Sequence, residues 1–90
     1  MERREVTIVN SRGLHARASA KFVNAVSQLP PGTQVRVAKG GNEAAGGSIL
    51  GLMMLGAARG DTIEVIVSGE RAPQVLDELC ELVANGFGED

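Results

Sequence analysis

The sequence has very few of the residues that build stacking surfaces, disulfides and metal sites. It contains no tryptophan or tyrosine and only two phenylalanines, so it offers no aromatic platform for single-stranded nucleic acid. The only cysteine is Cys80 and the only histidine is His15, which excludes an internal disulfide and leaves no set of metal ligands. The net charge of −2 excludes the basic surface that duplex DNA requires. We therefore expect no nucleic-acid partner and no metal.

Long apolar segments are also missing. The longest apolar run covers residues 49–58 and includes two glycines, whereas a membrane-spanning helix needs about twenty residues. The N-terminal MERREV contains no apolar signal segment, so we expect a cytoplasmic protein without a membrane partner. A chain of 90 residues with 43% hydrophobic content suffices for one modest core. We expect a single domain over residues 1–90.

Hydrophobic periodicity predicts alternating strands and helices. Strands are expected at residues 5–9, 34–38, 42–45 and 62–67, and helices at 16–28, at 48–55 and from Pro73 to about Gly86. Most of the strands have one apolar face, as in an antiparallel sheet that is solvated on its other side. The expected fold class is α+β, with a four-stranded antiparallel sheet, three helices on one face and the order βαββαβα. The first helix should pack one face on the sheet, formed by a stripe of Ala16, Ala20, Val23 and Val26 or Ser27 with Phe22, Ala25 and Leu29 beside it. Lys21 and Asn24 should point outward, and residues 87–90 should form a tail.

The segment Asn10 to Ser19, NSRGLHARAS, contains the most reactive group of the chain. His15 follows a turn at Gly13 and directly precedes a predicted helix, whose first backbone N–H groups have no intrahelical partner. These groups and the helix dipole favour a bound phosphate, and Arg17 adds a charged fork that matches phosphate oxygens. Because neutral imidazole is a nucleophile, the group predicts a reversible phosphohistidine. Two alternatives are an incidental histidine and a nucleophilic pair with Cys80, although Cys80 falls in an apolar pattern that suits a core residue.

A second segment combines a helix-capping serine with excess apolar residues. Ser48 is a good N-cap, because its hydroxyl can accept a bond from a free backbone N–H. The six apolar side chains within residues 49–55 are too many for one buried face of a short helix, so some of them should be exposed. An exposed apolar patch indicates a partner site, and methionine adapts to several partners. We therefore expect this segment to dock partner proteins.

Together the two segments resemble the signatures of HPr, the histidine-containing phosphocarrier family of the bacterial phosphotransferase system. Gly13-Leu14-His15-Ala16-Arg17-Ala18 is similar to the family's GLHARPA, and Gly47-Ser48-Ile49-Leu50-Gly51-Leu52-Met53-Met54-Leu55 is similar to the segment around its regulatory serine. The resemblance covers nearly the whole chain and looks most like the branch found in alphaproteobacteria. One position departs from the pattern, since Ala18 stands where the family usually has proline. Proline presets φ in the first helical turn, so the turn should survive with less pre-organisation.

The resemblance implies an open-faced β-sandwich and a phosphoryl relay. Enzyme I would phosphorylate His15 at Nδ1, and His15 would pass the group to a histidine of an enzyme IIA protein, with Arg17 stabilising the charge. Ser48 would be the substrate of an HPr kinase where the cell has one. No cofactor is implied, and the protein would be a monomeric carrier, not an enzyme. Docking would use the first helix and the following segment, at Ala16, Ala20, Ile49, Leu50, Met53 and Met54.

Two other functions remain open at this point. The first is a regulator of the same fold, whose phosphorylation state controls nitrogen or carbon metabolism without sugar transport. A genome lacking sugar permeases of the system would favour it. The second is a small α+β ligand-binding module with an incidental histidine, whose function would survive the substitution His15→Ala.

Overall fold

A computed structural model describes residues 1–89 and contains four strands and three α-helices. The elements follow the predicted order and are β1 (Glu2–Thr7), α1 (Ala16–Ser27), β2 (Gln34–Lys39), β3 (Asn42–Ala45), α2 (Ile49–Met54), β4 (Thr62–Ser68) and α3 (Ala72–Ala84), followed by a 3₁₀ turn, η1 (Gly86–Gly88). No helix within residues 1–89 has the length and apolar character needed to cross a bilayer.

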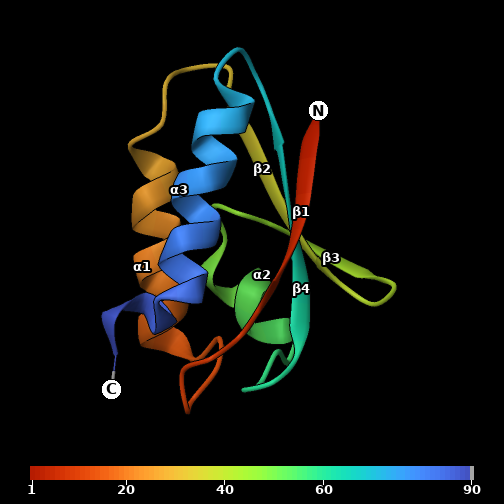
Figure 1. The fold of residues 1–90 in the computed structure, drawn as a ribbon, viewed down its shortest axis with the longest axis vertical. Helices are drawn as coiled ribbons and strands as arrows, with labels where there is room; N and C mark the ends of the chain where they lie inside the picture. Colours follow the sequence, from red (N-terminus) through yellow and green to blue (C-terminus); the bar gives the residue numbers. More distant parts are fainter. Residues whose placement is uncertain (90) are drawn as a thin grey trace.

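The strands form one antiparallel sheet in the order β1-β4-β2-β3. Figure 1 shows α1 and α3 running side by side along one side of this sheet, with α2 near the lower end of α1. The predicted α+β class and the open-faced sandwich are therefore confirmed. The start of α1, the loop before it and the end of α3 lie close together at the lower end of the view in Figure 1.

The core lies between the sheet and the helices. Inward residues of the central strand β4, Ile63, Val65 and Val67, are at most 1% exposed, as their alternation predicted. They face the buried stripe of α3, formed by Val75, Leu76, Leu79, Cys80 and Val83, and the buried Phe22 of α1. Burial raises the pKa of the Cys80 thiol, so this cysteine is a core residue and not a nucleophile beside His15.

The first strand is shifted toward the N-terminus relative to its prediction. It was expected at residues 5–9, but β1 covers Glu2–Thr7 and pairs with β4 along its whole length. Ile8 is fully buried just beyond the strand, where its backbone N–H donates to Asp61 O at 2.8 Å. The prediction was wrong because apolar periodicity cannot detect an edge strand whose first four residues are exposed.

Two predictions about helical and terminal residues also need correction. Ala16 is exposed, and Ala18 and Ser19 are fully buried, so the first turn of the packing face was placed wrongly. The rest of that face is confirmed, because Phe22 is buried and Val23, Ala25, Val26 and Leu29 pack against the core. The segment after α3 was expected to be a tail, but Phe87 is 2% exposed within η1. Phe87 therefore belongs to the core and the folded structure continues to Glu89, while Asp90 lies outside the described residues.

Candidate functional site

The loop before α1 places His15 at the helix N-cap. The loop is held by a bond from Gly13 N to Asn10 O of 3.2 Å and by one from Leu14 N to Ala57 O of 3.0 Å. Gly13 has a φ of +60°, a left-handed conformation that favours glycine. A Cβ at this position would lie 2.3 Å from Ala57 O, so only glycine allows the two loops to approach this closely. The approach fixes the position at which His15 enters the helix.

The hydrogen bonds of His15 fit one tautomer of its ring. Nδ1 lies 3.3 Å from the backbone nitrogen of Arg17, which can only donate. Nε2 lies 2.9 Å from both carboxylate oxygens of Glu89, which can only accept when ionised. The arrangement therefore fits the neutral imidazole with its proton on Nε2. In this tautomer the lone pair of Nδ1 faces the free N–H groups at the start of α1.

A shallow pocket of about 380 Å³ opens beside the imidazole. Its lining combines the predicted His15 and Arg17 with residues that were not predicted, and the full set is Ser11, Arg12, His15, Arg17, Lys21, Gly88 and Glu89. The side chain of His15 is 17% exposed, so the ring is shielded but can be reached from solvent. Three cations and one carboxylate around a neutral nucleophile make a site suited to an anionic group.

Sequence reasoning missed Lys21 and Glu89 as site residues. Lys21 was expected to point outward, yet it is half-buried and its Nζ donates to Phe87 O at 2.9 Å. Glu89 lies in the expected tail, and its Oε1 also accepts from Asn10 Nδ2 at 3.1 Å. The signal that could have found Glu89 is Phe87, because phenylalanine is usually buried and would bring the end of the chain against the core.

The ionisation of Glu89 is coupled to the imidazole. The hydrogen bond from His15 lowers the pKa of the Glu89 carboxyl, and the bond from Asn10 and the charge of Lys21 act in the same direction. The carboxylate is therefore ionised around neutral pH, with its side chain only 12% exposed. The described residues contain no group of three or more acidic, histidine or cysteine side chains that could hold a metal ion.

The second predicted segment forms α2, which packs against α1. Ser48 caps this helix as predicted, because its Oγ accepts from Gly51 N at 2.9 Å. Leu52 and Leu55 are buried, whereas four large apolar side chains of the segment are at least 40% exposed, namely Ile49, Leu50, Met53 and Met54. The predicted exposed patch is confirmed, and Ser48 lies at its edge and not among the residues that line the His15 pocket.

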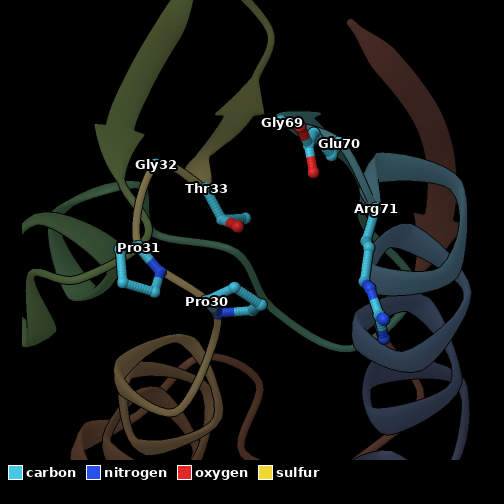
Figure 2. Close-up of a pocket in the computed structure, with 7 residues that line it drawn as sticks. All are labelled: Pro30, Pro31, Gly32, Thr33, Gly69, Glu70 and Arg71. Carbon is cyan, nitrogen blue, oxygen red and sulfur yellow. The ribbon is translucent and has the colours of Figure 1, made fainter.

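Another hollow of about 310 Å³ lies beyond the opposite end of α1. Figure 2 shows Pro30, Pro31, Gly32 and Thr33 on one side of it and Gly69, Glu70 and Arg71 on the other. None of these lining residues is a histidine or cysteine, and Glu70 and Arg71 bring charges of opposite sign. This hollow therefore lacks the nucleophile and the excess of cations that distinguish the His15 pocket.

Comparison with known proteins gives a consistent result. Residues 2–85 match the family described as PTS HPr component phosphorylation site. The phosphocarrier protein HPr of Cupriavidus necator is 39% identical over 89 residues, which cover 99% of this chain and 98% of the relative. The phosphocarrier protein NPr of Shewanella violacea is 38% identical, with coverage of 96% of this chain and 92% of the relative. The crystal structure of HPr-C-His from Thermoanaerobacter tengcongensis superposes with a TM-score of 0.91 at 31% identity, covering 100% of this chain and 99% of that chain.

Proposed function

This chain belongs to the HPr family of phosphocarrier proteins, and on that premise we propose that His15 carries the phosphoryl group on Nδ1. The observation that supports this assignment most strongly is the pair of hydrogen bonds on the ring. Glu89 accepts from Nε2, and the Arg17 amide donates to Nδ1 over 3.3 Å. That contact is long for an N–H donor, so the Nδ1 lone pair is released easily toward phosphorus.

Arg17 and the helix N-terminus would stabilise the transferring group. Phosphoryl transfer needs little covalent help from a protein and depends on positioning and on neutralising the charge of the equatorial oxygens. Arg17 lies two residues beyond the nucleophile and lines the same pocket. Once Nδ1 is bonded to phosphorus it no longer accepts a hydrogen bond, so the Arg17 N–H becomes available to a phosphoryl oxygen.

We assign the partners by the same reasoning. The donor is enzyme I and the acceptor is an enzyme IIA protein, which dock on the exposed start of α1 and on α2. This docking surface consists of Ala16, Ala20, Ile49, Leu50, Met53 and Met54, and four of these side chains are large, apolar and exposed. Because such a carrier must release each partner quickly, we expect it to act as a monomer. We also expect it to act in the cytoplasm.

Ser48 would regulate this docking. A phosphate on its hydroxyl could take over the hydrogen bond from Gly51 N at the start of α2. The helix would then be retained, while a negative charge would stand at the edge of the apolar docking surface. An HPr kinase with ATP should therefore phosphorylate Ser48, and the product should accept phosphoryl from enzyme I more slowly than the unmodified chain.

Relatives with two different names are similar to this chain at nearly equal identity. The relative named HPr is 39% identical and the one named NPr is 38% identical. A regulatory carrier that serves nitrogen or carbon metabolism is therefore the second candidate function. Competition between an enzyme IIA of a sugar permease and one of the nitrogen branch, both at equal concentration, would show which acceptor takes the phosphoryl group faster.

The first test is intact mass after incubation with phosphoenolpyruvate and a bacterial enzyme I. The wild type should gain one phosphoryl group that acid removes, because protonated imidazole is a good leaving group, and His15→Ala should gain none. Arg17→Ala should slow the gain roughly ten- to a hundredfold, the loss expected for one hydrogen bond to a charged group. Arg71→Ala, which removes an exposed arginine at the far hollow, is the matched control. An acid-stable adduct, or equal labelling of His15→Ala, would contradict the assignment.

A further inference from the structure

Glu89 lies beyond the residues that the family model matches, yet its side chain contacts the nucleophile His15. The family match ends at residue 85, yet both carboxylate oxygens of Glu89 lie 2.9 Å from His15 Nε2. The same carboxylate accepts from Asn10 Nδ2 at 3.1 Å, and Asn10 Nδ2 also donates to Gly13 O at 2.8 Å. Asn10 therefore joins Glu89 to the loop that positions the imidazole.

The segment that carries Glu89 is fastened at several points before it reaches the site. Phe87 is 2% exposed and has a φ of 58°, a conformation that phenylalanine adopts only when its surroundings demand it. Lys21 Nζ donates to Phe87 O at 2.9 Å, and Glu89 N donates to Gly86 O at 2.9 Å. These bonds hold a turn that directs the chain back toward α1, and this turn places the Glu89 carboxylate beside the His15 ring.

The groups around this carboxylate keep it ionised. Hydrogen bonds from His15 and Asn10 and the positive charge of Lys21 act on it directly, and Arg12 and Arg17 line the same pocket. The arrangement places a negative charge on the far side of the ring from Nδ1. When Nδ1 attacks phosphorus, the ring gains positive charge, and a carboxylate on Nε2 stabilises that charge as it develops.

We propose that Glu89 is a positioning residue for phosphoryl transfer, which holds the His15 ring through Nε2 and balances the charge that it gains. The inference rests on the proposed role of His15. In the transfer an N–P bond forms at Nδ1 while the bond from phosphorus to the phosphorylated atom of the donor protein breaks, and that electron pair stays on the donor. The Nε2 proton remains in the hydrogen bond to Glu89 throughout. In the reverse step toward an acceptor, the electron pair returns to Nδ1 and the ring is again neutral.

Two substitutions separate the hydrogen bond from the charge. Glu89→Gln keeps an oxygen that can accept from both Asn10 and His15 but removes the charge, whereas Glu89→Ala removes both. Glu78→Gln removes the same charge from an exposed position on α3 and is the matched control. Proton–nitrogen correlation spectra of the imidazole report the bond itself, since the Nε2 proton is observed only while a hydrogen bond protects it from exchange with water.

The variants should differ according to whether they lose the hydrogen bond to His15, the charge of Glu89 or both. The Nε2 proton should be visible in wild type, in Glu78→Gln and in Glu89→Gln, and lost in Glu89→Ala. The initial rate of phosphoryl gain from enzyme I should fall about tenfold in Glu89→Ala and about threefold in Glu89→Gln, the scale of a partly exposed charge-assisted hydrogen bond. Glu78→Gln should react as wild type.

Two outcomes would overturn the proposal while leaving the carrier assignment intact. If Glu89→Ala retains the protected Nε2 proton, the contact does not hold the ring. If Glu89→Ala reacts within twofold of Glu78→Gln while His15→Ala stays unlabelled, His15 is the carrier and Glu89 does not assist it. Should no variant be labelled although enzyme I labels a control carrier, the proposed function itself fails, and with it the role of Glu89 in transfer.

Discussion

Replacing Gly13 by alanine tests whether the close approach of two loops holds the site together. The new Cβ would lie 2.3 Å from Ala57 O and 2.9 Å from Ala58 Cα, both backbone atoms that cannot rotate away. The φ of +60° adds about 1 kcal/mol for a residue with a side chain. Forcing the loops apart adds roughly 1–3 kcal/mol, and lengthening the 3.0 Å bond from Leu14 N to Ala57 O adds up to about 1 kcal/mol. We expect a loss of about 3 kcal/mol in the free energy of unfolding.

Gly40 provides the control, because it has the same φ of 60° and a Cβ added to it would meet no atom within 4 Å. Gly40→Ala should therefore lose only the conformational part, about 1 kcal/mol. Urea unfolding followed by far-ultraviolet circular dichroism is the assay, since the chain has no tryptophan or tyrosine. With a slope of about 1 kcal/mol per molar urea, the two midpoints should differ by about 2 M. Equal midpoints would show that the contact with Ala57 adds no constraint.

Three further predictions concern other parts of the molecule. Ser48→Ala removes the acceptor for Gly51 N and should lower the free energy of unfolding by about 1 kcal/mol in the same assay, whereas Ser48→Asp, which keeps an acceptor, should lose less. The hydrogen bond from Ala58 N lowers the pKa of the Asp61 carboxyl below its ordinary 3.8, so its contribution to stability is complete above that pH and is lost as the pH falls through the folded-state pKa. A carbon NMR titration of Asp61 with a midpoint at or above the ordinary value would contradict this. Leu50→Ser should change stability by less than about 0.5 kcal/mol, because Leu50 is 68% exposed, and should slow phosphoryl gain from enzyme I; unchanged kinetics would remove Leu50 from the docking surface.

Local patterns predicted the fold well where burial repeats along the chain. The alternation in β4 and the helical stripe of α3 each place every second or every third to fourth residue in the core, and both elements lie where expected. The edge strand β1 was misplaced because its pairing with β4 comes from backbone hydrogen bonds, and its exposed Glu2, Arg3 and Arg4 carry no apolar signal. Only the first turn of α1 was misjudged, because Ala16 is exposed and Ala18 is buried, and alanine by itself does not distinguish the two faces of a helix.

The site divides into a part that sequence could predict and a part that it could not. His15 and Arg17 are neighbours in the chain, so the expectation that they share a helix N-terminus needs only local structure. Glu89 is separated from His15 by 74 residues and reaches it only because α3 returns alongside α1 and η1 turns the chain inward. The sequence does not indicate that Glu89 contacts His15, because most glutamates near a terminus are exposed to solvent.

Ala18 shows how the chain can depart from the family's usual proline without losing the site. It is fully buried in the first turn of α1, where a small apolar side chain fits against the core. The first bond that closes this turn runs from Ser19 N to His15 O at 2.9 Å, so the N–H of Ala18 precedes the hydrogen-bonded part of the helix. A proline here would sacrifice no helical bond, and alanine in its place leaves one more N–H at the helix N-terminus. Gly13 packs against Ala57 on one side of the imidazole and Glu89 contacts Nε2 on the other, so we expect Ala18→Pro to change the rate of phosphoryl gain only slightly.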